Sequence, residues 1–338
     1  MERKRMSASL PERLGPTIGK IHLPLLTEML AAAGHEDAHL VDDMIAGFPV
    51  TGAMHTGGFG RRIEGGRGAR GRPMKGVVPD VLELRAQCSR INRQTLARAD
   101  PGMEFAETIW ENTLEECRRG LIGPLQRVCD VDLGDVFLVH RFGTAQVKDG
   151  ARKVRMIDDC RSNAANQFAI AWETTHNDRE DTVSEAILRL QRRLRDPSSG
   201  AGVRVALEDF VGAYKTLAPS DDQRWLMWVL VWNPEEAEWM CGEMQTMPFG
   251  AVGGVLAWWR CAMAQRAIMR RLFEAIIFYY VDDTHVIDVE PGSGEAVAAF
   301  REAMSILVWA LDAKKSCLLY TSDAADDSLR VDLGGRRI

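Results

Sequence analysis

Apolar positions recur at different spacings along the chain, and the changes in spacing predict where helices and strands lie. Up to about residue 103 the pattern is weak and predicts no regular element. Over Glu104–Arg119 apolar residues recur every three or four positions, which predicts a helix. From Val136 onward short apolar runs alternate with helical stretches. This alternation predicts an α+β fold.

Several individual elements follow from this pattern. Strands are predicted at four separate segments: Val136–Val139, Lys153–Ile157, Val203–Leu207 and Trp225–Trp232. Two further runs separated by Asp282-Asp283 predict a hairpin with an acidic turn: Ile276–Val281 and Thr284–Val289. Helices are predicted from the capping box Thr182–Glu185 to just before Pro197, over Leu256–Ala275, and from Gly294 through Leu311. The order of elements predicts a sheet with helices on one face.

Composition narrows the class of protein. Hydrophobic residues make up 46% of the 338 and charged residues 27%, so the chain can bury a core. The net charge of −6 argues against a uniformly basic surface, although a local basic channel remains compatible with it. The longest apolar run, Trp225–Trp232, is too short to cross a membrane, and the first residues carry no secretory signal.

The seven cysteines include no C-x-x-C pair, which favours reduced thiols over disulfides or a zinc site. Together with the missing signal, this predicts an intracellular protein, cytoplasmic or nuclear, without a membrane partner.

Two segments stand apart from the rest. Residues 57–76 are rich in glycine and arginine, which is compatible with a solvated linker or with a segment that follows a phosphate backbone. Cys317–Ile338 abandons the preceding periodicity and looks like translated sequencing-adapter read-through, so the natural chain is expected to continue differently after Ser316. The expected regions are therefore 1–103, 104–200, 201–316 and the tail 317–338.

The candidate chemistry is acidic. Asp209 follows the apolar strand Val203–Leu207, and Asp282-Asp283 follows an aromatic-apolar strand 73 residues later (282 − 209). A carboxylate at the end of a buried strand is costly unless it is paired or binds a cation. Two such sites on adjacent strands would supply oxygen ligands for Mg²⁺, and two metals can promote phosphoryl transfer. Alternatively, Asp282-Asp283 only favours a tight turn.

Five segments, in consistent order over about Phe137–Ser316, resemble the motifs of the reverse transcriptases of retroelements. They are Lys153–Arg161 (similar to K-x-R-x-x-x-D-x-R), Asp209–Tyr214 (D-x-x-x-A-Y), Met247–Gly250 with Arg260 downstream (P-F-G), Tyr280–Asp283 (Y-x-D-D), and Trp309–Lys315 (a segment carrying a lysine). The resemblance implies fingers and a polymerase palm, a ferredoxin-like βαββαβ antiparallel sheet with helices on one face. It also implies an RNA-directed DNA polymerase that adds dNTPs to a primer on an RNA or DNA template.

The resemblance further implies roles for individual residues. Asp209 and Asp282 would hold two Mg²⁺ or Mn²⁺ ions, with Asp283 in support and the carbonyl of Phe210 assisting. The remaining positions would contact the nucleotide or the nucleic acid. Those expected at the nucleotide are Lys153 and Arg155 on the triphosphate, Tyr214 under the sugar, Phe249 and Gly250 lining the site, and Lys315 near the leaving pyrophosphate. Those expected at the nucleic acid are Arg161, Arg260 and Tyr280.

Two alternatives stay open beside this interpretation. RNA-making relatives usually carry an acid five residues after the first catalytic aspartate, where this chain has Tyr214, so DNA synthesis is favoured over an RNA-directed RNA polymerase. A catalytically inactive relic that only binds nucleic acid or a protein is the other alternative. The chain lacks the G-x-x-x-x-G-K-[ST], H-E-x-x-H and G-x-S-x-G motifs of other enzyme classes.

Overall fold

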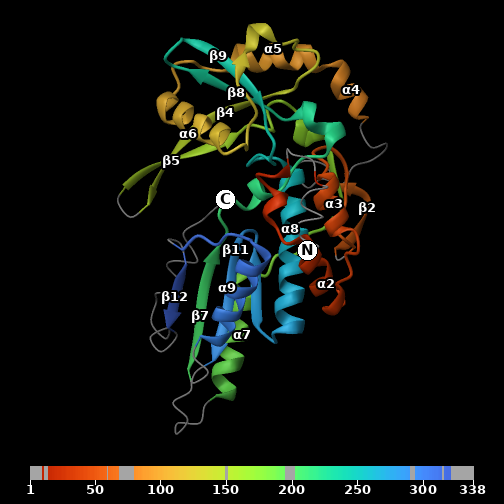
Figure 1. The fold of residues 1–338 in the computed structure, drawn as a ribbon, viewed down its shortest axis with the longest axis vertical. Helices are drawn as coiled ribbons and strands as arrows, with labels where there is room; N and C mark the ends of the chain where they lie inside the picture. The colour runs from red at the N-terminus through yellow and green to blue at the C-terminus, as the bar shows by residue number, and fades with distance from the viewer. Residues whose placement is uncertain are drawn as a thin grey trace. The chain divides into compact units, whose positions relative to one another are not determined.

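The protein has a mixed α+β fold in two compact units (Figure 1). The computed structural model describes residues 10, 14–58, 60–67, 80–148, 151–194, 202–289, 294–313 and 316–320. The first unit comprises Met1–Lys20, Asp37–Thr175 and Tyr214–Arg260, and the second Ile21–Glu36, His176–Ala213 and Cys261–Ile338. The chain passes between the units several times, so the division differs from the consecutive regions expected from the sequence.

A five-stranded sheet in the order β3-β9-β8-β4-β5 forms the centre of the first unit. Its strands are β3 (Gln126–Arg127), β4 (Leu138–Lys148), β5 (Ala151–Asp158), β8 (Trp228–Asn233) and β9 (Glu238–Glu243). β4 runs parallel to β8, and the other neighbouring pairs are antiparallel. The long β4–β5 hairpin extends the two short strands that the sequence predicts in this region.

Two helices cover opposite faces of this sheet. Leu96 of α5 (Cys88–Arg98) packs against Leu138 and Leu230 on one face. Ile109 of α6 (Ala106–Arg118) packs against Val231 on the other. Because side chains alternate across a strand, Leu230 and Val231 point to different helices, and both faces of β8 are buried. The helix predicted over Glu104–Arg119 is thus confirmed as α6.

The region before residue 103, where no regular element is predicted, contains helices and a small sheet. Its helical segments are η2 (Ile18–Lys20), α2 (Leu23–Ala32), α3 (Leu40–Ala46), α4 (Val81–Ala86) and α5. Its strands β1 (Gly52–Met54) and β2 (Arg61–Arg67) flank β6 (Ala169–Thr174). Part of the predicted Gly/Arg linker is therefore strand, and residues 68–79 of the chain lie outside the described residues.

A second sheet, in the order β10-β11-β7-β12, forms the centre of the second unit. Its strands are β7 (Val203–Asp209), β10 (Ile276–Tyr280), β11 (Asp283–Val289) and β12 (Cys317–Tyr320), and every neighbouring pair is antiparallel. The helices of this unit are α2, α7 (Glu180–Arg193), α8 (Val252–Leu272), of which the part from Cys261 belongs to this unit, and α9 (Glu295–Leu307).

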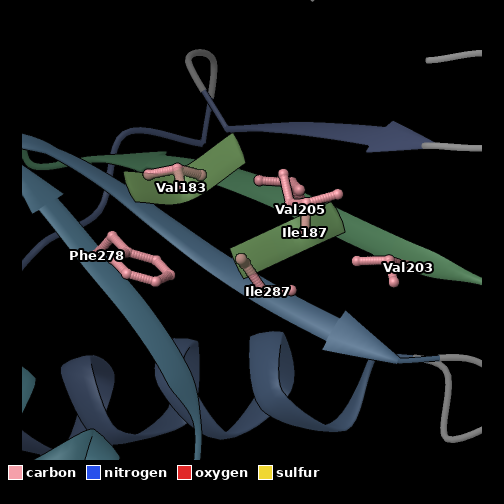
Figure 2. Packing of buried hydrophobic residues seen from close by; sticks show 6 residues of the cluster. All are labelled: Val183, Ile187, Val203, Val205, Phe278 and Ile287. Carbon is pink, nitrogen blue, oxygen red and sulfur yellow. The ribbon is translucent and has the colours of Figure 1, made fainter. Parts of the chain in front are cut away.

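Helices cover both faces of the second sheet, which corrects the expectation of helices on one face. Val183 and Ile187 of α7 pack against Val203 and Val205 of β7, as Figure 2 shows. Glu208 has the opposite parity on β7 and is contacted by Arg301 of α9. The alternation of side chains therefore places α7 and α9 on different faces.

Several predicted boundaries are displaced, each for a local reason. α7 begins after Arg179, and the hydroxyl of Thr182 does not cap it; the acids Glu180 and Asp181 occupy the first turn, where the helix dipole favours them. The predicted strand at Trp225–Trp232 begins with the 3₁₀ turn η7 (Asp221–Leu226). The last predicted helix ends as α9 at Leu307, because Val308 adopts a left-handed conformation.

Regular secondary structure continues past Ser316, the expected end of the fold. Cys317–Tyr320 forms the edge strand β12 on β7, so excluding the tail from the fold is wrong for these four residues. Residues 321–338 lie outside the described residues. Along the part of the chain that the structure describes, no helix is long and apolar enough to cross a membrane.

The packing of α7 yields a stability prediction. Ile187 is 6% exposed in the cluster of Figure 2, whereas its neighbour Leu188 is 50% exposed. We expect Ile187→Ala to lower the free energy of unfolding by about 2–4 kcal/mol, because it leaves a cavity between α7 and β7. The matched change Leu188→Ala should cost less than about 0.5 kcal/mol. Urea denaturation measures both, and equal losses would contradict this packing.

Candidate functional site

Two of the predicted acids are direct neighbours on adjacent strands. β7 and β11 pair antiparallel with Asp283 opposite Asp209, and β10 places Tyr280 opposite Asp283. Residues directly opposite each other share a face, with Cβ atoms about 4.5–5.5 Å apart. Both aspartates are half-buried, and Tyr280 is 43% exposed. The pairing of strands thus brings together carboxylates that are 74 residues apart in the chain (283 − 209).

The hairpin turn consists of Val281 and Asp282, one residue earlier than predicted. Tyr280 and Asp283 close the hairpin as its last paired residues, so Asp283 belongs to β11. Val281 has φ of 59°, a conformation that two-residue hairpin turns require and that a β-branched residue rarely adopts. Asp282 therefore lies at the tip of the turn, half-buried, beside the pair formed by Asp209 and Asp283.

A further aspartate, Asp312, lies on the other side of Asp209. The amide of Asp312 donates to the carbonyl of Asp209 (2.8 Å), and the amide of Val211 donates to the carbonyl of Ala310 (2.9 Å). The two hydrogen bonds lie on either side of an antiparallel β-bridge between Phe210 and Leu311. Asp312 is therefore opposite Asp209. Asp283, Asp209 and Asp312 thus form an aspartate row across three neighbouring segments.

The sequence did not indicate Asp312 as a candidate site residue. It lies in the segment Trp309–Lys315, which the sequence singles out only for its lysine, and nothing in the local pattern indicates that this segment returns to β7. The ring of Phe210 contacts Phe300 of α9 edge-on, at 6.3 Å between centroids, which anchors the end of β7 to the helix before this segment.

The donor chemistry of the aspartate row fits Mg²⁺ or Mn²⁺, which prefer carboxylate oxygens. Within the described ranges, no group of three or more His, Cys, Asp or Glu side chains is arranged to hold a metal ion. Mg²⁺ is commonly held by one or two carboxylates, with waters and substrate phosphates completing its shell. Asp209 and Asp283, with Asp282 beside them, match that smaller requirement.

A fifth acid at this end of the sheet, Glu208, has a structural role. Glu208 precedes Asp209, faces α9 and is 2% exposed. Its carboxylate accepts hydrogen bonds from Arg301 (2.6 and 2.9 Å) and from the hydroxyl of Ser316 (2.6 Å). A buried carboxylate that is paired in this way is a structural tie between β7, α9 and the segment after it. Because side chains alternate across a strand, Glu208 points away from the face that carries Asp209 and does not belong to the aspartate row.

In the first unit, three of the predicted nucleotide-binding residues are in contact. The guanidinium of Arg155 lies over the ring of Phe249, 4.3 Å from its centroid. The ring of Tyr214 is 5.8 Å from that of Phe249, with the planes tilted by 59°. Arg155 is exposed, Phe249 half-buried and Tyr214 buried. We call Arg155, Phe249 and Tyr214 the aromatic cluster.

Gly250 lets the chain pass close to β5 beside the aromatic cluster. Its φ is 138°, and an added Cβ would lie 2.3 Å from the carbonyl oxygen of Asp158. The side-chain amide of Asn166 holds this loop, donating to the carbonyl of Gly250 (2.7 Å) and accepting from the amide of Val252 (2.9 Å). A residue with a side chain at position 250 would displace the loop from β5.

The remaining predicted contacts are arranged differently. Lys153 is exposed and shares a face of β5 with Arg155, two residues away, and Arg161 is exposed in the following turn. Arg260 is 3% exposed, and its guanidinium binds the carboxylates of Asp37 (2.7 and 3.0 Å) and Asp43 (2.7 Å). Arg260 thus forms buried structural ion pairs and is not exposed for contact with nucleic acid. Lys315 lies outside the described residues.

Comparison with protein-family models and with curated proteins returns no match for this chain.

The strained turn beside the aspartates yields a second stability prediction. We expect Val281→Asn to raise the free energy of unfolding by about 1 kcal/mol, because asparagine tolerates the left-handed conformation. Val281→Ile, which keeps the branched side chain, should give no gain. Thermal denaturation of the three proteins measures the effect. A less stable asparagine variant would contradict the left-handed turn.

Proposed function

We propose that this protein is an RNA-directed DNA polymerase, which adds deoxynucleotides to a primer 3′-hydroxyl by metal-assisted nucleotidyl transfer. The observation that carries the proposal is the pairing of Asp209 with Asp283 at the ends of adjacent strands, with Asp282 in the turn between β10 and β11. These acids occupy the positions in which the sequence resembles the first palm motif and the Y-x-D-D motif of reverse transcriptases.

The order of elements in the second unit supports a palm. From β7 onward this unit reads β7, α8, β10, β11, α9 and β12, and the sheet order is β10-β11-β7-β12. This is the split βαβ arrangement, in which the first strand lies between the third and the fourth. A polymerase palm is built in this way, so the topology agrees with the function that the motifs suggest. Such a topology is shared by proteins of many functions, and the acids give it its specific meaning.

The acids would act by holding divalent cations. Bound Mg²⁺ or Mn²⁺ would favour ionisation of the primer hydroxyl and stabilise charge on the leaving pyrophosphate. Asp209 and Asp282 would hold these ions, as the resemblance implies, and Asp283, opposite Asp209 on β11, would support them. Because Glu208 is held by Arg301 on the opposite face, it keeps β7 in the register that presents Asp209.

The aromatic cluster would bind the incoming nucleotide. The exposed guanidinium of Arg155 suits phosphate oxygens, and its position over Phe249 limits the orientations that it can adopt. Tyr214 lies behind Phe249 and would occupy the space that a ribose 2′-hydroxyl needs. This arrangement favours deoxynucleotides, and it therefore favours DNA synthesis over the RNA-polymerase alternative.

The first test is primer extension. We expect the chain to extend a DNA primer on an RNA template only when Mg²⁺ or Mn²⁺ is present, and Asp209→Asn to reduce extension about a thousandfold or more. Glu302→Gln removes one negative charge from an exposed position on α9 and serves as the matched control. Unchanged extension by Asp209→Asn would rule out the proposal. Template binding by the unmutated chain without any extension would instead support the inactive relic.

The second test concerns the sugar. We expect Tyr214→Val to raise incorporation of ribonucleotides relative to deoxynucleotides, because it removes bulk from the place of the 2′-hydroxyl. Tyr214→Phe keeps the ring and should keep the preference for deoxynucleotides. The ratio of kcat/KM for the two nucleotide types measures the effect. An unaltered ratio in Tyr214→Val would show that another residue excludes the hydroxyl.

A further inference from the structure

Four charged side chains form a buried group in the first unit, which we call the charged quartet: Glu116 of α6, Arg141 of β4, Asp158 of β5 and Lys215. Arg141 is 2% exposed and binds Asp158 through two nitrogens (2.7 and 3.2 Å). Its third nitrogen donates to Glu116 (2.9 Å). Two cations and two anions balance, which makes their burial tolerable.

Lys215 closes the charged quartet from a different part of the chain. Its ammonium contacts the second carboxylate oxygen of Glu116. Burial lowers the pKa of Lys215 to about 8, and the carboxylate of Glu116 favours the charged form, so the amine is an ammonium at pH 7. Lys215 belongs to η6 (Ala213–Thr216), a short 3₁₀ turn, whose hydrogen-bond geometry is generally poorer than that of an α-helix. The ion pair therefore fixes the turn to α6.

The charged quartet is directly connected to the aromatic cluster at three points. Lys215 follows Tyr214 in η6. Asp158 lies on β5 three residues after Arg155, and its amide donates to the carbonyl of Phe249 (3.4 Å). Each ring or guanidinium of the aromatic cluster is thus carried by a segment that the charged quartet holds. Such ties matter because small displacements in a binding site have large effects on rate.

We propose that Lys215 is a positioning residue for sugar selection: by its ion pair with Glu116 it holds Tyr214 against Phe249, in the place that excludes a ribose 2′-hydroxyl. The inference rests on the proposed function and goes one step further, because it assigns the choice between deoxy- and ribonucleotides to a residue that does not touch the sugar. Without the ion pair, η6 can move and the ring of Tyr214 can yield.

The test measures kcat/KM for dNTP and rNTP separately, on the full chain. We expect Lys215→Met to reduce the preference for dNTP over rNTP about tenfold. General destabilisation would lower both values together and leave the ratio unchanged. Lys215→Arg keeps the charge and should keep most of the preference. Arg118→Met removes a cation from an exposed pair with Glu115 on α6 and is the control, with an unchanged ratio expected.

A double variant separates positioning from independent effects. Because Lys215 would act through the ring of Tyr214, adding Lys215→Met to Tyr214→Val should lower the preference no further. If Lys215→Met fails to fold, Glu116→Gln removes the same ion pair from the other side and should shift the ratio in the same direction. An unchanged ratio in the folded variant, with Tyr214→Val altering it, overturns this inference alone. Absence of extension by the unmutated chain overturns the proposed function itself.

Discussion

The antiparallel register between β7 and β11 is the constraint on which the candidate site depends. It sets Asp283 opposite Asp209, and it sets Thr284 opposite Glu208 on the other face. A shift of one residue would exchange the faces, turning the aspartates toward the α9 side and Glu208 away from Arg301. The apolar residues of the same strands, Val203, Val205 and Ile287, fix the register through their burial against α7. Core packing and the placement of the acids are thus one property of these strands.

Both units contain a strand that carries a buried, paired acid on one face and a more accessible charged residue on the other. In the second unit the acid that faces the core, Glu208, is bound by Arg301 and Ser316, while its neighbour Asp209 is half-buried in the aspartate row. In the first unit Asp158 binds Arg141 in the core, while Arg155 on the same strand is exposed over Phe249. In each case one strand carries a neutralised charge on one face and a functional candidate on the other. Buried pairs of this kind are sensitive to loss of one partner.

Gly250 in the first unit and Val281 in the second are positions where an unusual backbone conformation shapes a group of candidate residues. Gly250 allows the loop after Phe249 to approach Asp158, and Val281 accepts an unfavourable conformation to close the two-residue turn. Strained residues persist only where the surrounding structure holds them, and they concentrate at functional positions. Gly250 lies beside the aromatic cluster, and the strained residue Val281 lies beside the aspartate row.

The sequence by itself determined the α+β class, the helix at Glu104–Arg119, the strand ending at Asp209 and the hairpin that carries Asp282 and Asp283, because these rest on local periodicity. Tertiary structure alone decided the rest. Pairing of distant strands brought in Asp312 and made β12 an edge strand. Arg260 is buried in ion pairs with Asp37 and Asp43, so it does not lie at the surface. Lys215 forms a separate ion pair with Glu116, which the sequence does not indicate. Such outcomes depend on which segments meet across the fold, and no local pattern records that.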